Sequence, residues 1–272
     1  MRLNRLCNLE DWQDPGLRAV MCRVLPHFAR DVRNYPDGHE HRKHWEYAHL
    51  VAGLEHLGVI HPSSWILSVA AGHEEPFYEL TNHVRWVFAV DLYGTSEFSS
   101  REARETILMN PSAFARVPHN SRRLVVQYMN ALDLRFEDGL FDGVFCLSSI
   151  EHFGGFENAR KALGEMERVL RPGGIAAITT ECIVNQQPPF DDPFMLLFTP
   201  ELLDELSRSV EGLETVEPID YSVTPASLGT VASQEDADQL ARQGLTQYPH
   251  VVMERDGRYF TSAAVFFRKK AR

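Results

Sequence analysis

The sequence has few cysteines, no long apolar run and comparatively few basic residues. Its four cysteines, at positions 7, 22, 146 and 182, are scattered and form no CxxC pair, which argues against a zinc knuckle or a disulfide framework. No stretch approaches the roughly 20 apolar residues that span a bilayer, and acidic residues follow the first arginines where a signal peptide needs an apolar run. We therefore expect a cytoplasmic protein with reduced thiols.

Acidic residues outnumber basic ones, 38 against 27, and the formal net charge is -11. Nucleic-acid binding depends on basic patches that release counterions from the phosphates. The balance of charge therefore predicts no nucleic-acid partner and no membrane partner, and it favours a small-molecule substrate.

The order of the apolar patterns predicts a helical N-terminus followed by an α/β domain. Apolar residues recur at helical spacing over 17–28 and 47–54, ahead of any strand signal. We assign residues 1–60 to an N-terminal helical cap and residues 61–272 to the main domain.

Five nearly continuous apolar runs alternate with helical segments in the main domain. Such runs are typical of strands buried on both faces, so they predict a doubly wound, mostly parallel sheet. A further strand is expected at 261–267 after a hairpin at Asp256-Gly257, and Thr199-Pro200 is expected to open a helix. The five runs lie at 65–71, 86–92, 123–129, 141–149 and 175–180.

The first strand is followed by small residues and then by two acids, Glu74 and Glu75. This loop lacks the GxGxxG pattern of a dinucleotide site, and two carboxylates would repel a pyrophosphate. They would instead attract a cationic ligand such as S-adenosyl-L-methionine (AdoMet), which carries a sulfonium and an ammonium group. The alternative is that both acids only complement the helix dipole, an effect of about 0.3 to 1 kcal/mol.

Asp91 ends the second strand, 19 residues after Gly72. A carboxylate at a strand end can accept hydrogen bonds from both hydroxyls of a ribose. The alternative is a turn-forming aspartate, with Gly94 supplying the bend.

Four segments in order resemble a class I AdoMet-dependent methyltransferase of the type 11 group: ILSVAAGHE (66–74), VFAVDLYG (87–94), residues 129–154 and EMERVLRPGGIAAITTE (165–181). The resemblance covers about residues 43 to 182 and implies a Rossmann-like sheet of seven strands. The sequence departs from the family pattern in the first loop. Ser68 occupies the position of an acid, Ala70 that of the first glycine and Glu74 that of the third glycine. We interpret this as a rebuilt loop in which Glu74 supplies a substitute contact.

The resemblance also implies which residues contact the cofactor. The first loop would hold the methionine part, Asp91 and Leu92 the ribose, and Asn130 and Ala131 the adenine, while residues 146–148 would form the floor beneath the sulfonium. The expected cofactor-binding residues are Ala70, Ala71, Gly72, His73, Glu74, Asp91, Leu92, Asn130, Ala131, Cys146, Leu147 and Ser148.

Glu151 and His152 follow the fourth strand and are the catalytic candidates. A hydroxyl acceptor needs a general base, and His152 is the stronger candidate for it. The alternative is a structural histidine that positions the loop. The run His39–His44 lacks the spacing of HExxH, so we expect a solvated, charged segment and no metal site.

Two late segments, 183–197 and 222–258, are expected to form a lid over the acceptor. They and their neighbours offer four possible substrate contacts, Phe190, Tyr221, Tyr248 and His250. The sequence thus predicts a methyltransferase that acts on a small molecule, with a hydroxyl of a metabolite or sugar as acceptor and S-adenosyl-L-homocysteine as product. The alternative is a catalytically inactive, methyltransferase-like binding or regulatory protein.

Overall fold

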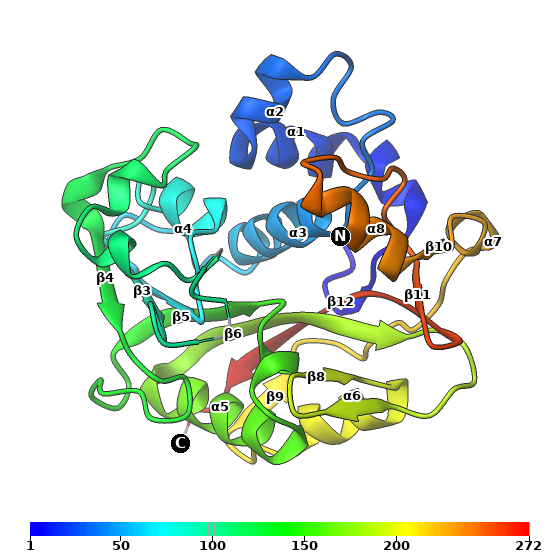
Figure 1. Cartoon of the computed structure of the whole chain (residues 1–272). Coiled ribbons are helices and arrows are strands. Elements are labelled where there is room, and N and C mark those ends of the chain that lie inside the picture. Colours follow the sequence, from blue (N-terminus) through cyan, green and yellow to red (C-terminus); the bar gives the residue numbers. More distant parts are fainter. Residues whose placement is uncertain (97, 101, 272) are drawn as a thin grey trace.

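The computed structural model describes residues 1–96, 98–100 and 102–271, and a mixed sheet forms their centre (Figure 1). Its main path is β10-β11-β12-β6-β5-β2-β3-β4, and β1 and β9 also pair with β12. The strands of this sheet are β1 (Arg5–Leu6), β2 (Trp65–Val69), β3 (Trp86–Asp91), β4 (Leu124–Tyr128), β5 (Phe141–Leu147), β6 (Leu170–Ile183), β9 (Leu213–Thr215), β10 (Ala232–Ser233), β11 (Met253–Arg255) and β12 (Arg258–Lys269). A separate hairpin pairs β7 (Phe190–Asp192) with β8 (Met195–Leu197).

The five predicted apolar runs form the parallel part of the sheet. β4, β3, β2, β5 and β6 pair in parallel, and β12 runs antiparallel beside β6. All seven residues of β5 are buried, as a strand covered on both faces requires. The α/β fold with a mostly parallel sheet is therefore confirmed.

The sheet has ten strands in the described residues, where the sequence predicts seven. The outer edge of β12 pairs in turn with β11, β1 and β9, at Phe260, at Ala263–Ala264 and at Phe267–Lys269. β1 and β10 have two residues each and β9 and β11 three, which is too short to show an alternating pattern.

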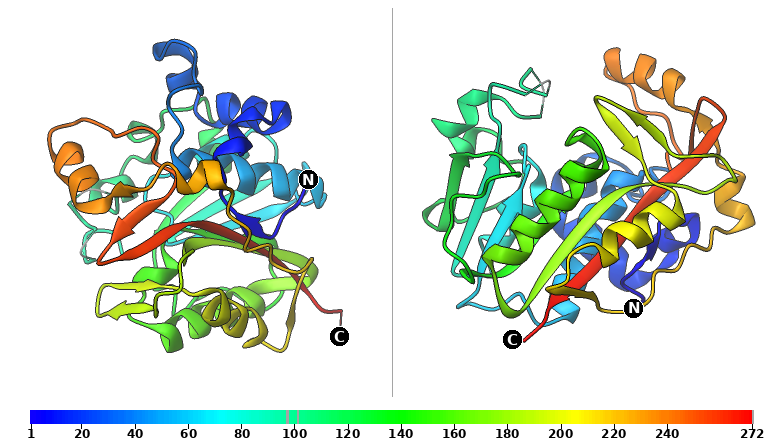
Figure 2. Two further views of the ribbon diagram at one scale, coloured as in Figure 1. Left: turned by 90° about the vertical axis from the view of Figure 1, so that its right-hand side faces the viewer. Right: turned by 90° about the horizontal axis from the view of Figure 1, so that it is seen from below.

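Helices cover both faces of the sheet, and Figure 2 shows the two layers from further directions. α3 contacts β5, β6 and β12 on one face, while α5 and α6 contact β6 on the other. No helix of the described residues is long and apolar enough to cross a membrane. The helices are α1 (Pro15–Val24), α2 (Pro26–Asp31), α3 (Arg42–His56), α4 (Glu75–Leu80), α5 (Phe156–Val169), α6 (Pro200–Arg208), α7 (Pro225–Leu228) and α8 (Gln234–Arg242).

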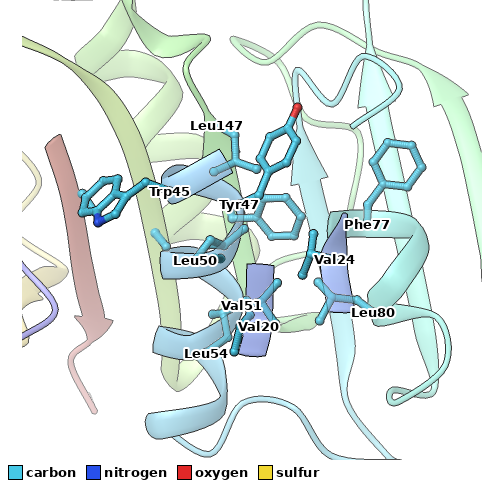
Figure 3. Packing of buried hydrophobic residues seen from close by; sticks show 14 of the residues in the cluster. Val20, Val24, Trp45, Tyr47, Leu50, Val51, Leu54, Phe77, Leu80 and Leu147 are labelled. Atoms are coloured by element: carbon cyan, nitrogen blue, oxygen red, sulfur yellow. The ribbon is translucent and has the colours of Figure 1, made fainter. Parts of the chain in front are cut away.

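α3 packs into one hydrophobic cluster that also includes α1, α4 and the sheet. Tyr47, Val51 and Leu54 of α3 lie near α1 and α4, and Trp45 points away toward β12 (Figure 3). The stacking of Trp45 on His49, with ring centroids 4.4 Å apart, shows that this tryptophan is a core residue. The N-terminal helices thus share their core with the sheet.

Local signals place most element ends correctly. The Thr199 side chain accepts a hydrogen bond from the Leu202 amide, and Pro200 opens α6. Asp256 and Gly257 both have positive φ, 51° and 75°, and join β11 to β12 in the predicted two-residue hairpin. The single helix expected over 17–28 is two helices, because Pro26 interrupts the pattern.

Candidate active site

A cavity of about 950 Å³ lies at the carboxyl ends of the parallel strands, near the upper end of the range of small-molecule sites. The segments that follow β2, β3, β4 and β5 all contribute to its wall, together with the start of α3. The carboxyl ends of these four strands therefore converge on one cavity. The predicted site residues that line the cavity are Ala70, Gly72, His73, Glu74, Asp91, Leu92, Asn130, Ala131, Ser148, Glu151 and His152.

The loop after β2 is held in shape by Asp91 at the end of β3. Asp91 accepts hydrogen bonds from the backbone amides of Gly72 (2.8 Å) and Leu92 (2.6 Å). Burial raises its pKa, although these two bonds act in the opposite direction. Ala70 and Gly72 have φ of 51° and 49°, so the glycine is in a conformation that suits it and the alanine is strained. A carboxylate has about four lone-pair sites, which leaves Asp91 free to accept further bonds.

Glu74, at the N-terminus of α4, turns toward α3. Its Oε1 lies 3.1 Å from Lys43 Nζ and 3.5 Å from the hydroxyl of Tyr47. Its Oε2 is buried and has no hydrogen-bond partner among the described residues. Burial raises the pKa of Glu74 to about 8, more than Lys43 lowers it. Glu74 is thus a partly satisfied carboxyl group on the cavity wall.

The first turn of α3 carries a buried charge cluster, Arg42, Lys43 and Glu46. Glu46 is fully buried and accepts hydrogen bonds from the hydroxyls of Ser148, Thr179 and Ser262. Burial favours its neutral form, but Lys43 (3.4 Å), Arg42 (3.7 Å) and the hydroxyls lower the pKa of Glu46 below its ordinary value. The expectation of a solvated segment is wrong for Arg42 and Lys43, because the helix turns both side chains into the cavity wall.

Glu151 and Glu181 line the same cavity as His152. Glu151 is 1% exposed, and its Oε2 accepts a hydrogen bond of 2.9 Å from the Thr180 hydroxyl. Glu181 is 5% exposed, and its Oε1 pairs with the Arg42 guanidinium. The second oxygen of each, Glu151 Oε1 and Glu181 Oε2, has no partner in the described part of the chain. Burial, followed by repulsion from Glu181, raises the pKa of Glu151 well above its ordinary value.

His152 closes a short 3₁₀ turn (Ile150–His152) after β5. Its Nδ1 lies 2.7 Å from the backbone carbonyl of Phe194, and its ring meets Phe98 edge-on with centroids 5.0 Å apart. A carbonyl oxygen can only accept, so Nδ1 carries the hydrogen and Nε2 keeps its lone pair. The structure thus holds His152 in the tautomer that a general base requires.

Some of the residues expected to contact the adenine or to form the floor beneath the sulfonium line the cavity, and the others are buried in the hydrophobic core. Asn130 lines the cavity, and its Oδ1 accepts from the Leu132 amide at 2.9 Å. Ala71, Cys146 and Leu147 do not line the cavity, because their side chains are buried in the hydrophobic clusters on the two faces of the sheet. Of the expected floor, only Ser148 lines the cavity.

The two segments expected to form a lid, 183–197 and 222–258, both reach the cavity. Phe194 of the first and Tyr248 of the second line it. Of the other suggested contacts, Phe190 packs under Arg255 at 4.7 Å and Tyr221 donates to Asp204 at 2.8 Å, outside the cavity. His250 stacks on His41, with centroids 4.2 Å apart. Among the described residues, no three His, Cys, Asp or Glu side chains are grouped to hold a metal ion.

Comparison with known proteins finds a matching family model and a relative that matches over a short segment. Residues 67–178 match the type 11 model of a methyltransferase domain. A 57-residue segment is 42% identical to the O-methyltransferase resE of Aspergillus sclerotiorum. That segment is 21% of this chain and 20% of the relative, so the chain matches about a fifth of the relative's length.

Solved structures share the fold at low sequence identity. The [4+2]-cyclase SpnF has a TM-score of 0.56 and 18% identity, over 95% of this chain and 98% of its own. An S-adenosylmethionine-dependent methyltransferase from Clostridium acetobutylicum has a TM-score of 0.50 and 12% identity, over 90% of this chain and 97% of its own. Because one of these proteins is named a cyclase, the shared fold alone does not specify the reaction.

Proposed function

Because the chain is a class I, Rossmann-like methyltransferase of the type 11 group with AdoMet as its cofactor, we propose that it methylates a hydroxyl group of a small molecule. The observation that carries this proposal is the orientation of His152. The Phe194 carbonyl places the hydrogen on Nδ1, so the lone pair of the neutral ring is on Nε2, and His152 lines the cavity that the strand ends share.

The residues of the cavity fit AdoMet. Glu74 Oε2, a buried oxygen without a partner, suits the ammonium of the methionine part, and the small residues Ala70 and Gly72 leave the adjoining backbone open. Asp91 retains lone pairs for the ribose hydroxyls. Asn130 and Ala131 would contact the adenine. When bound, AdoMet supplies a methyl group on a sulfonium, a good leaving group.

In this proposal His152 makes the acceptor hydroxyl nucleophilic. Nε2 takes the hydroxyl proton, while the Phe194 carbonyl holds Nδ1–H and stabilises the imidazolium that forms. Phe98 and Phe194 both line the cavity and offer apolar surface to the acceptor. The protein's remaining task is alignment, because methyl transfer is an in-line displacement.

The experiment has two stages, binding and transfer. Calorimetry with AdoMet and with S-adenosyl-L-homocysteine should show binding of both. Incubation with methyl-labelled AdoMet and a panel of hydroxylated metabolites should then transfer label to oxygen, and His152→Ala should remove most of the transfer but little of the binding. Absence of binding at millimolar cofactor would refute the proposal and favour a binding or regulatory protein.

A further inference from the structure

Two buried carboxyl groups on the cavity wall have no part in the function proposed above. Glu151 and Glu181 each present one oxygen without a hydrogen-bond partner among the described residues, and both side chains are more than nine-tenths buried. Unpaired buried carboxylates are costly, by several kcal/mol for each ion. Both line the same cavity as His152, in which the acceptor would lie.

The ion pairs at this wall leave one carboxyl group without a cation. Arg42 pairs with Glu46 and Glu181, and Lys43 pairs with Glu46 and Glu74. No ion pair joins Glu151 to a basic residue in the part of the chain that the structure describes; its one side-chain bond comes from the Thr180 hydroxyl. Two fixed cations therefore serve four carboxyl groups.

A bound ligand could supply the missing positive charge. AdoMet carries two positive groups, a sulfonium and an ammonium, and one carboxylate of its own, so its net charge is +1. Glu74 faces the expected place of its methionine part. With AdoMet bound, the four carboxyl groups would still outnumber the positive charges by one, and Glu151 would be the group without a cation. Burial and repulsion from Glu181 raise the pKa of Glu151, which disfavours its charged form, and a cation beside the carboxyl group would oppose both effects.

We propose that Glu151 and Glu181 bind a protonated amine of the acceptor, which makes the acceptor a hydroxylated amine and not a neutral sugar or an acid. This inference rests on the methyltransferase function proposed above. The amine donates hydrogen bonds to Glu151 Oε1 and Glu181 Oε2, while the hydroxyl lies at His152 and the carbon skeleton packs on Phe98 and Phe194.

Three phenols that differ only in one terminal group test the proposal: tyramine, its neutral alcohol tyrosol, and 4-hydroxyphenylacetate. Each is titrated into protein saturated with S-adenosyl-L-homocysteine, which has no sulfonium. Tyramine should bind at least about tenfold more tightly than tyrosol, since a hydrogen bond to a charged group contributes about 1.5 to 3 kcal/mol. 4-Hydroxyphenylacetate should bind most weakly.

Substitutions identify the residues responsible. Glu151→Gln and Glu181→Gln should each lower tyramine affinity about tenfold or more and change tyrosol affinity little. Glu211→Gln, an exposed glutamate outside the cavity, is the control and should change neither. If Glu181→Gln does not fold because Arg42 loses one of its two carboxyl partners, Glu151→Gln decides, since Glu151 has no ion pair to lose among the described residues.

The possible failures are distinct. If S-adenosyl-L-homocysteine does not bind, the proposed function fails together with this inference. If it binds while tyramine and tyrosol bind equally, or tyramine does not bind at millimolar concentration, only the amine subsite is refuted. It is also refuted if Glu151→Gln weakens AdoMet relative to S-adenosyl-L-homocysteine and leaves tyramine unchanged, because Glu151 would then serve the sulfonium.

Discussion

The ammonium group of Lys43 lies 3.1 Å from Glu74 Oε1, while Glu74 Oε2 has no partner among the described residues. One carboxyl group is therefore half satisfied by the protein and half available to a ligand. Because α3 brings Lys43 and β2 leads to Glu74, the contact joins the N-terminal helices to the first loop of the sheet.

Glu74 should release a proton when a ligand ammonium binds. The pKa of Glu74 is about 8 in the empty protein, so at pH 7 the group is mostly protonated, and a cation beside it favours ionisation. Calorimetry with S-adenosyl-L-homocysteine in two buffers of different ionisation enthalpy should show close to one proton released, and clearly less for Glu74→Gln. Equal release by the two proteins would contradict the assignment.

Replacing His152 should reduce turnover much more than cofactor affinity. We expect His152→Ala to lower kcat by about 10²- to 10⁴-fold, the usual contribution of a general base, with S-adenosyl-L-homocysteine affinity nearly unchanged. His61→Gln, an exposed histidine bonded only to Ser63, is the control. Parallel losses in kcat and affinity would instead indicate a positioning role.

Asp91→Ala should weaken S-adenosyl-L-homocysteine binding about tenfold to a hundredfold. The loss combines the bonds to the ribose with the release of the Gly72 amide that shapes the first loop. Asp91→Asn keeps one acceptor oxygen and should fall between wild type and alanine. Asp31→Asn, at an exposed position paired with Arg30, provides the control, and a dissociation constant that Asp91→Ala leaves unchanged would refute the ribose role.

Ala70→Gly should stabilise the protein by about 1 kcal/mol, because a left-handed conformation costs alanine about that much and glycine almost nothing. The neighbouring Ala71→Gly is the matched control. Ala71 is fully buried and is not in the left-handed region, so losing its methyl group should destabilise the protein by roughly 1 to 2 kcal/mol. Chemical denaturation measures both, and destabilisation by Ala70→Gly would contradict the reasoning.

Glu46→Ala should destabilise the protein by about 3 to 5 kcal/mol, since it removes one of the two carboxyl partners of Arg42 and of Lys43 and leaves three hydroxyls without their acceptor. On the outer face of the same helix, Glu55→Ala breaks an exposed pair with Arg23 and should cost less than about 1 kcal/mol. The pKa of Glu46 is lowered from 4.5, so its contribution is complete above pH 4.5 and is lost as the pH falls further. Urea titrations at neutral and acid pH measure this difference.

The fold could be predicted because its main signals are local. Apolar runs identified the parallel strands, and Thr199-Pro200 and Asp256-Gly257 marked a helix start and a hairpin. The short strands β1, β9 and β10 could not be predicted, since two or three residues become a strand only through the partner beside them.

The charged part of the site was the least predictable. Arg42 and Glu46 look like residues of a solvated helix, and their burial depends on Glu181, more than 130 residues away in sequence. Glu181 is the last residue of the segment 165–181 that resembles the family, but the resemblance assigned it no role. Cys146 and Leu147 were misplaced because they belong to hydrophobic clusters on opposite faces of the sheet, and a segment match does not show which residues face the cavity.

The position of β12 between β6 and the short strands β11, β1 and β9 has a consequence for biosynthesis. A nascent chain can form β2 to β6 as it leaves the ribosome, but β6 then remains an open edge until residues 258–269 have been made. An open edge invites pairing with other chains, so this interval is when chaperone protection matters most.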